Sequence, residues 1–475
     1  MVNLTVLASL QDCLNGVCAG RSNCVAYASD SDPLYQIEWV KAYNLAIDVT
    51  PTAVIRPNST QEVAATVQCA AENGIKVQAR SGGHSYANFG LGDEAVAVDM
   101  TNLQDYSMNE TTWYATIGAG MKLGDVDRNL HKTGRAFAHG VCPGVGLGGH
   151  ATVGGLGPMS RMWGTALDHV VEVEMVTANG TILHVNERLN PDMFYGVQGA
   201  GASFGIITEF VMRTHPEPEE VAQFTFDFTF GVEPSKLADS YIQWQKLIAD
   251  PSLDRRFGSQ LVISPIGVTI TGTFYGSAAE WNASGILSRL PQNGSVIFTD
   301  WPSSLTAWTV QEALYLSDTP SHFYSKSLGL RQQDLLSEYS ATKLFQYLES
   351  QPKGTLLWFI VFDSSGGAVA DVPMNATAFA HRNKIMFYQS YAVDAVALSN
   401  ETWSFLTNFH NNLVEVLPLN ATGRGTYPGY VDLNISGVPQ GQYWESNLPA
   451  LQILKSKWDP NDVFHNPQSV QPVEV

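Results

Sequence analysis

The sequence predicts an α+β protein built from two domains. At 475 residues the chain is longer than one hydrophobic core usually supports. A cluster of proline and glutamate at Glu217–Glu220 separates short strands and helices from a region of long strands and amphipathic helices. We therefore expect one domain over residues 1–217, with its core at about 47–217, and a second over 218–425. The last segment, 426–475, is expected to fold back on the first domain.

The first domain begins with a strand, a helix, a second strand and a glycine loop. Ser59 and Glu62 have the spacing of a capping box and predict a helix start, and Asn73-Gly74 predicts its end. Ile75–Arg80 then alternates like a strand. It leads directly into Ser81-Gly82-Gly83-His84.

Further elements follow from hydrophobic periodicity and turn residues. Asn179-Gly180 is a strong hairpin signal between two of these strands. The expected strands are Ala95–Met100, Trp113–Gly118, Val170–Val176, Gly180–Val185 and Phe224–Phe230, and the expected helices are Leu123–Gly134 and Ser235–Ile248. Residues 191–216 are expected to begin as a helix and to end as a strand.

Composition and charge narrow the possible partners. Hydrophobic residues make up 44% and charged residues 15% of the chain, as in a globular protein. The formal charge of -19 repels nucleic acid and anionic membranes, and no apolar run of 18 residues is present. We expect a small-molecule substrate, no nucleic-acid or membrane partner, and a monomer.

The cysteines and glycosylation sequons indicate a secreted protein. Cys13, Cys18, Cys24 and Cys69 lie in the first 70 residues and are expected to form two disulfides, whose connectivity the sequence leaves open. Cys142, the fifth cysteine, is not part of these two disulfides. Ten N-x-S/T sequons are present, at Asn3, Asn58, Asn109, Asn179, Asn282, Asn293, Asn375, Asn400, Asn420 and Asn434.

Two glycine-rich segments carry nucleophilic side chains. Glycine lets the backbone approach phosphate closely, so Arg80-Ser81-Gly82-Gly83 is a candidate pyrophosphate cradle next to His84. Cys142 lies in a second such segment, between His139 and His150. Zinc is the competing interpretation of these three residues, but a further Cys or His ligand is missing, and we expect no metal.

Together, Ser81-Gly-Gly-His84-Ser-Tyr86 and Cys142-Pro-Gly-Val-Gly-Leu-Gly-Gly-His150 resemble the motifs of berberine-bridge-enzyme-like flavoproteins of the vanillyl-alcohol oxidase superfamily. The resemblance implies that superfamily's two-domain fold: an FAD-binding domain, and a substrate domain whose antiparallel sheet is covered by helices. It also implies covalent FAD, with His84 on the flavin 8α-methyl and Cys142 on C6. Residues 426–475 resemble the family's berberine-bridge-like return to the FAD domain.

Among the members, the sequence is most similar to fungal carbohydrate oxidases of the glucooligosaccharide oxidase type, through Tyr427-Pro-Gly-Tyr430-Val-Asp432 and the Asp363 segment. This similarity implies Tyr430 as catalytic base, assisted by Asp363. The implied substrate-binding residues are Tyr86, Gln389, Trp358 and Val361. The implied cofactor-binding residues, besides His84 and Cys142, are Arg80, Ser81, Gly82, Gly83, Ser85, Val145, Gly146, Gly149, His150, Gly205 and Ile207.

The chemistry explains why a tyrosine needs a carboxylate partner. Oxidising an anomeric hydroxyl to a lactone removes the hydroxyl proton while hydride passes to the flavin. A free tyrosine, with a pKa of about 10, is a poor base at neutral pH, and Asp363 can take up or stabilise its proton. The resemblance implies O2 as the oxidant, which is reduced to H2O2. Val145 matches a position that in related proteins lies beside the flavin edge where oxygen reacts, and valine there is compatible with an oxidase.

Some residues depart from the carbohydrate oxidase pattern. Val361 stands where the glucooligosaccharide oxidase type has a polar, sugar-contacting residue, and Gly157–Trp163 differs from the usual aromatic and histidine-rich run. Trp163, Trp358 and Tyr388 could stack on a sugar or belong to the core. Three other functions stay open: a dehydrogenase with a non-oxygen acceptor, an oxidase of aromatic or secondary-metabolite alcohols, and a non-catalytic carbohydrate-binding protein.

Overall fold

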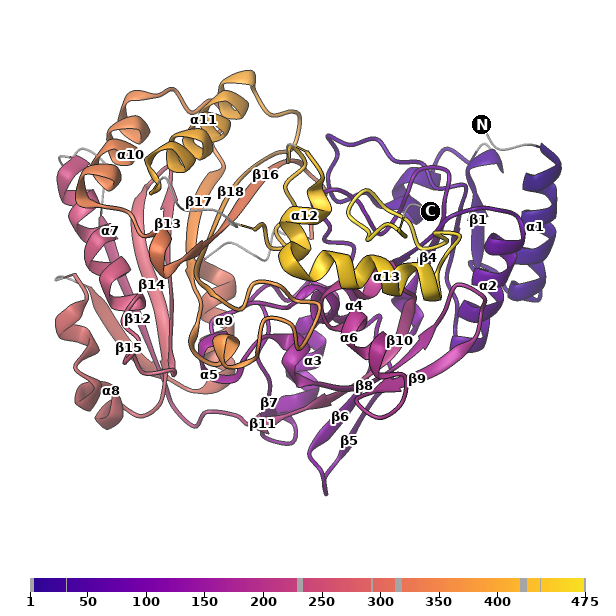
Figure 1. Cartoon of the computed structure of the whole chain (residues 1–475), viewed down its shortest axis with the longest axis horizontal. Helices are drawn as coiled ribbons and strands as arrows, with labels where there is room; N and C mark the ends of the chain where they lie inside the picture. Colours follow the sequence, from indigo (N-terminus) through magenta and orange to yellow (C-terminus); the bar gives the residue numbers. More distant parts are fainter. Residues whose placement is uncertain are drawn as a thin grey trace.

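The elements of the protein fall into two halves joined by a shared C-terminal segment (Figure 1). The computed structural model describes residues 4–30, 32–228, 234–291, 294–311, 318–418, 425–435 and 437–473. Within them the strands form a four-stranded, a five-stranded and a seven-stranded sheet and one two-stranded pair. The predicted α+β fold is therefore confirmed.

The four-stranded sheet carries the first glycine loop. Its order is β1-β2-β4-β3, with β2, β4 and β3 parallel and β1 antiparallel to β2. The predicted helix and strand before the loop are present as α2 and β3. The bounds here are α1 Leu4–Cys18, β1 Val25–Tyr27, β2 Ala53–Ile55, α2 Thr60–Glu72, β3 Val77–Arg80 and β4 Val96–Asp99.

Helix α2 forms only one of the two hydrogen bonds of the predicted capping box. The Ser59 side chain accepts a hydrogen bond from the Glu62 amide, as predicted. The Glu62 carboxylate instead binds the Arg21 guanidinium at 2.7 Å and accepts from the Asn58 amide. Arg21 competes successfully because a charge-assisted bidentate pair is stronger than one amide hydrogen bond.

The five-stranded sheet is antiparallel, in the order β5-β6-β10-β8-β9. It contains the predicted hairpin, with Asn179 and Gly180 between β8 and β9. The predicted helix Leu123–Gly134 ends earlier, at His131, and Gly134 follows with a φ of 65°. The bounds are β5 Tyr106–Asn109, β6 Tyr114–Gly118, α3 Leu123–His131, α4 Leu147–Val153, α5 Ser160–Trp163, β8 Val170–Val176, β9 Ile182–Asn186, α6 Pro191–Ala200 and β10 Ile206–Arg213, with β7 Arg135–Ala136 pairing β11 His215–Pro216.

The seven-stranded antiparallel sheet dominates the second half, in the order β15-β12-β14-β13-β17-β18-β16. Helices α7, α10 and α11 cover one of its faces (Figure 1). The predicted strand at Phe224 ends at Phe228, and residues 229–230 lie outside the described ones. The bounds are β12 Val221–Phe228, α7 Pro234–Ile248, β13 Phe257–Ser264, β14 Gly267–Tyr275, α8 Ala278–Ser284, β15 Ser295–Thr299, α9 Trp301–Gln311, β16 His322–Arg331, α10 Glu338–Ser350, β17 Trp358–Ser364, β18 Lys384–Asp394 and α11 Asn400–Val416.

The C-terminal segment packs against the first half (Figure 1). It contains α12 Pro439–Trp444 and α13 Leu448–Trp458. The Val77 amide of β3 donates to the Val463 carbonyl at 2.9 Å. One hydrophobic core combines residues of the first half, up to Met212, with Ala378 and others from 443–470, whereas a second core runs from Ala222 to Leu417.

Surface features relevant to the cell compartment are also visible. Seven of the ten sequon asparagines lie in the described residues, and all seven are exposed. The other three, Asn3, Asn293 and Asn420, lie outside the described residues. None of the described helices has the length and apolar character needed to cross a membrane.

Two disulfides tie the N-terminal helix to its neighbours, joining Cys13 to Cys69 and Cys18 to Cys24. The first closes a loop of 56 residues and the second a loop of 6. By the loop-entropy relation, removing the long link costs about 4 kcal/mol and the short one about 2 kcal/mol. We therefore expect Cys13→Ser/Cys69→Ser to lower the free energy of unfolding about twice as much as Cys18→Ser/Cys24→Ser, measured by chemical denaturation. Equal losses would contradict the loop-length argument.

Candidate active site

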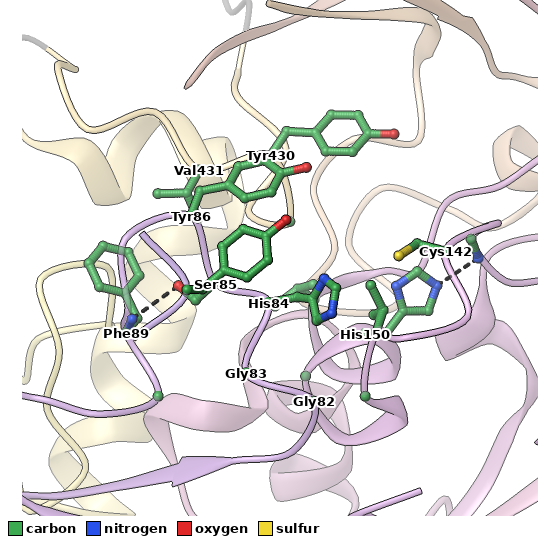
Figure 2. Close-up of a pocket in the computed structure, with 18 of the residues that line it drawn as sticks. Gly82, Gly83, His84, Ser85, Tyr86, Phe89, Cys142, His150, Tyr430 and Val431 are labelled. Atoms are coloured by element: carbon green, nitrogen blue, oxygen red, sulfur yellow. Dashed lines mark hydrogen bonds between the residues drawn. The ribbon is translucent and has the colours of Figure 1, made fainter. Parts of the chain in front are cut away.

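A cavity of about 740 Å³ is lined by residues of both halves of the protein. Figure 2 shows the part of it formed by the two glycine-rich segments and Tyr430–Val431. The first half contributes the loop after β3 and the glycine-rich segment around α4. The second half contributes strands β17 and β18, and the C-terminal segment adds the stretch Tyr427–Val431. The two sequence motifs that are far apart in the chain therefore meet in one place.

The two glycine-rich segments contact each other through their backbones. A Cβ atom on Gly82 would lie 2.2 Å from the Gly146 amide nitrogen, and one on Gly146 would lie 2.0 Å from the Gly82 nitrogen. Any other residue at either position would force the segments apart. Gly149, also on the cavity wall, has no atom within 4 Å of its Cβ position, so backbone faces open space there.

Arg80 lies on the cavity wall, but its guanidinium is already paired with groups of the protein. Its guanidinium donates to the Asp99 carboxylate at 2.6 Å and to the Val40 carbonyl, and the side chain is buried. The predicted pyrophosphate cradle therefore offers glycine backbone rather than a free arginine. Ser81 is likewise engaged, because its hydroxyl donates to the Ala119 carbonyl at 2.6 Å.

His84 and Cys142 point into the same pocket from the two glycine-rich segments (Figure 2). The His84 Nε2 atom lies 2.7 Å from an oxygen of Asp318. Burial lowers the pKa of His84 below its usual value, against the opposing effect of Asp318, so the ring is neutral at pH 7. Cys142 is half-buried and takes part in neither disulfide.

The two histidines that flank Cys142 have structural partners. The His139 ring bonds Asp127 at 2.7 Å, and His150 Nε2 accepts from the Gly140 amide at 2.9 Å. Burial, and to a lesser extent His139, lower the pKa of His150 to about 3, which keeps it neutral and able to accept. Across the described ranges, no three His, Cys, Asp or Glu side chains group as a metal site.

Tyr430 and Asp363 form a buried hydrogen-bonded pair at the cavity. The Tyr430 hydroxyl donates to Asp363 Oδ2 at 3.1 Å, and Gln389 Nε2 donates to the same oxygen at 3.3 Å. Asp363 lies on β17, Gln389 on the neighbouring strand β18, opposite Val361, and Tyr430 on the C-terminal segment. The predicted catalytic pair is thus brought together from elements 67 residues apart in sequence.

Burial changes the acidity of both groups. It raises the pKa of Asp363 to about 7, although the hydrogen bonds from Tyr430 and Gln389 act against this rise. Burial and the neighbouring Asp363 charge raise the pKa of Tyr430 well above 10. Tyr430 therefore rests protonated, while Asp363 can gain or lose a proton near neutral pH.

Two contacts hold the Tyr430 segment against β16. The Ser327 hydroxyl donates to the Tyr430 carbonyl at 2.7 Å. Lys326 and Asp432 form an ion pair at 3.0 Å, and both side chains are buried. Breaking such a buried pair leaves an uncompensated charge, so this contact fixes where the tyrosine sits.

Comparisons with known proteins agree with this arrangement. Residues 51–186 match a model of the FAD binding domain, and residues 426–471 match one described as berberine and berberine like. The FAD-linked oxidoreductase sorD of Penicillium rubens is 38% identical over 97% of this chain and 98% of its own. The chain belongs to the berberine-bridge-enzyme-like FAD-linked oxidoreductases.

Solved structures of relatives have the same fold. A xylooligosaccharide oxidase from Myceliophthora thermophila C1, in complex with xylobiose, superposes with a TM-score of 0.88 at 27% identity, covering 98% of this chain and all of that one. A glucooligosaccharide oxidase from Acremonium strictum, described with 6-S-cysteinyl, 8α-N1-histidyl FAD, gives 0.85 at 28% identity, covering 98% of this chain and all of that one. The protein is thus an FAD-linked oxidoreductase with the vanillyl-alcohol oxidase fold.

The cavity of this berberine-bridge-like enzyme fits a large, partly polar cofactor. Gln78 Oε1 and Trp308 Nε1 are buried without a hydrogen-bond partner, and both residues line the cavity. Such groups need a partner in the working molecule. All thirteen predicted cofactor-binding residues line the cavity: Arg80, Ser81, Gly82, Gly83, His84, Ser85, Cys142, Val145, Gly146, Gly149, His150, Gly205 and Ile207.

The wall beyond the catalytic pair is largely aromatic. Phe359 stacks on Tyr391 with ring centroids 5.0 Å apart, and Tyr391 is parallel to Phe323 at 5.8 Å. Phe323 in turn stacks on Tyr86 at 4.4 Å. Val393 on β18 and Leu357, just before β17, extend this apolar wall.

Two of the predicted substrate contacts need correction. Trp358 lies on the opposite face of β17, 2% exposed, and packs edge-on against Phe405 in the second core. Val361 faces the cavity side, opposite Gln389, but is buried and does not line the cavity. Tyr388 is also a core residue, and Trp163 stacks on His215 away from the cavity. Tyr86 and Gln389 do line it.

Several cavity residues were not predicted from the sequence. These residues lie in loops or strands with no motif of their own, and only a period-2 count along each strand could have indicated which face they occupy. They are Tyr43, Gln78, Gln260, Trp308, Phe323, Phe359 and Tyr391.

The corrected strand orientation gives a test with a matched pair of variants. Trp358→Ala should lower the free energy of unfolding by about 3–5 kcal/mol, because it empties a core site. The Trp358→Ala protein that remains folded should have the same KM as the unsubstituted protein. Phe359→Ala should instead raise KM, with a smaller loss of stability. Thermal unfolding and steady-state kinetics measure both, and a raised KM for Trp358→Ala would show that the correction is wrong.

Proposed function

We propose that this protein is a secreted oligosaccharide oxidase that oxidises the C1 hydroxyl of its substrate to a lactone and reduces O2 to H2O2. The observation that carries the proposal is the buried Tyr430–Asp363 pair, which shares one cavity with His84 and Cys142. The related xylooligosaccharide and glucooligosaccharide oxidases support an oligosaccharide as substrate. The disulfides and exposed sequons support secretion.

The proposal includes FAD held through His84 and Cys142. The solved relative with a cysteinyl and histidyl flavin supports this attachment. So does the placement of one neutral imidazole and one thiol at the same cavity. Gln78, Gly149 and the contacting glycine segments would line the rest of the cofactor site. The predicted domain limits, 1–217, 218–425 and 426–475, belong to the same proposal.

The residues of the chain perform the proton transfer. When bound, FAD supplies the acceptor for the hydride that leaves the substrate carbon. Tyr430 accepts the hydroxyl proton as its own proton moves to Asp363, so no isolated phenolate forms in the buried site. Gln389 holds the Asp363 carboxylate in place and faces the substrate side. The aromatic wall excludes water from the reacting carbon.

This assignment predicts a specific pH dependence. Asp363 must be ionised to accept the proton, and its pKa is raised to about 7. The rate of flavin reduction should therefore fall about tenfold per pH unit below pH 7 and level off above it. Tyr430→Phe should lower that rate about 10²- to 10⁴-fold with substrate binding kept. Stopped-flow reduction across pH 5–9 measures both.

Asp363→Asn is the matched control for this experiment. It keeps the shape and the hydrogen bonds from Tyr430 and Gln389 but cannot take a proton. The slow rate that remains should no longer change near pH 7. An unchanged rate in Tyr430→Phe would refute the tyrosine as base.

The aromatic wall favours a second candidate, an oxidase of aromatic or secondary-metabolite alcohols. Phe323, Phe359 and Tyr391 offer stacking surface with little capacity for hydrogen bonding, and Val361 adds none. An oligosaccharide carries several hydroxyls that lose water on binding and need partners. In this candidate the catalytic pair keeps its role.

A substrate panel separates the two candidates. The oxidase proposal expects O2 uptake and H2O2 formation with xylo-, gluco- or chitooligosaccharides, and little activity with benzylic alcohols. Activity on aromatic alcohols alone would replace the first candidate by the second. Flavin that is reduced by oligosaccharides but reoxidised only by a quinone would instead indicate a dehydrogenase.

A further inference from the structure

His84 is held by an acidic residue outside the two glycine-rich segments. The carboxylate of Asp318 lies between the first and second halves of the protein. One of its oxygens is 2.7 Å from His84 Nε2, and the other accepts from Lys122 Nζ at 3.0 Å. Lys122 immediately precedes α3 and pairs with Gly146, so the carboxylate joins the histidine loop to the segment that carries Cys142.

This contact fixes which ring nitrogen carries the proton. Burial raises the pKa of Asp318, but the hydrogen bonds from Lys122 and His84 outweigh it and keep the carboxylate ionised. An ionised carboxylate can only accept, so His84 Nε2 is the protonated nitrogen. The ring is neutral, which leaves the lone pair on Nδ1.

Two further contacts restrict the arrangement. The Tyr43 ring packs on the His84 ring with centroids 4.9 Å apart, which limits rotation of the imidazole. The Asp318 carboxylate rests where Gly144 has no side chain. A Cβ atom at Gly144 would lie 1.8 Å from Asp318 Oδ1. This glycine, two residues after Cys142, therefore leaves room for the acid that orients His84.

We propose that Asp318 is a positioning residue for the covalent attachment of flavin to His84: it directs Nδ1 at the flavin and receives the Nε2 proton as the bond forms. The inference rests on the attachment proposed above. Asp318 acts through His84 and need not touch the substrate.

The step balances as follows. The Nδ1 lone pair forms the new N–C bond to the 8α carbon, which loses one hydrogen as a proton. The Nε2 proton passes to Asp318, so the attached imidazole ends neutral. The two electrons of the broken C–H bond remain on the isoalloxazine as reduced flavin. Dioxygen removes these electrons and takes up two protons, the one lost by the 8α carbon and the one received by Asp318, to become H2O2, which is also the acceptor chemistry of the proposed reaction.

Covalent flavin can be scored at His84 alone in a Cys142→Ala parent. After acid precipitation and washing, the parent should retain flavin on the polypeptide, and His84→Ala/Cys142→Ala should retain none. Cys142→Ala/Asp318→Asn should bind as much total flavin as the parent but retain at least tenfold less after acid. The amide keeps the shape and an acceptor oxygen but cannot take the proton.

Other variants separate proton transfer from a general loss of structure. Asp318→Glu in the same parent should restore most of the acid-stable flavin. Gly144→Ala should reduce it as Asp318→Asn does, because its methyl group takes the place of the carboxylate. Asp371→Asn is the control, since Asp371 is as exposed as Asp318 (54% and 53%) and is also ion-paired, with Arg255, but does not contact His84.

The possible failures have different meanings. Equal acid-stable flavin in the Asp318→Asn variant and the parent would overturn the role of Asp318 and leave attachment at His84 intact. Absence of acid-stable flavin from the Cys142→Ala parent itself would overturn the attachment at His84, and this inference with it. A loss of total flavin in Asp318→Asn that Asp318→Glu does not reverse would show a structural role only and would also overturn the proposal.

Discussion

The site depends on one backbone contact, between Gly82 and Gly146. Each glycine occupies the space in which the other's Cβ would lie, so neither segment tolerates a side chain there. This contact brings His84 and Cys142 to one cavity although 58 positions in the numbering separate them. The cavity wall and both attachment residues follow from an approach that only glycine allows.

The proposed proton transfer also requires an ionised carboxylate, that of Asp363, in a buried site. Asp363 is useful because burial brings its pKa to about 7, and the same burial works against its ionised form. The surroundings limit this effect with hydrogen bonds from Tyr430 and Gln389, and the Lys326–Asp432 pair fixes the tyrosine segment from behind. The catalytic pair is therefore held by contacts from β18, through Gln389, from β16, through Lys326, and from the C-terminal segment, through Asp432.

Much of the first half could be predicted from sequence because its signals are local. The Ser59 cap, the Asn179-Gly180 turn and the glycine loop each need only neighbouring residues. Trp358 was assigned to the wrong face, although strand geometry was available to correct it: Trp358 and Asp363 are five residues apart on β17, and an odd separation puts them on opposite faces. Asp318 and Tyr43 could not be found this way. Their contacts with His84 join parts of the chain with no shared pattern.

The pairing of β3 with the C-terminal segment also bears on how the protein is made. The Val77 amide meets the Val463 carbonyl, and residues from 443–470 complete the first hydrophobic core. A nascent chain on the ribosome therefore carries β3 with an open edge until residue 463 has emerged. Tyr430 reaches its place through the same late segment. The cofactor cavity is therefore complete only after the residues of the C-terminal segment that line it, from Tyr427 to Gln468, have been synthesised.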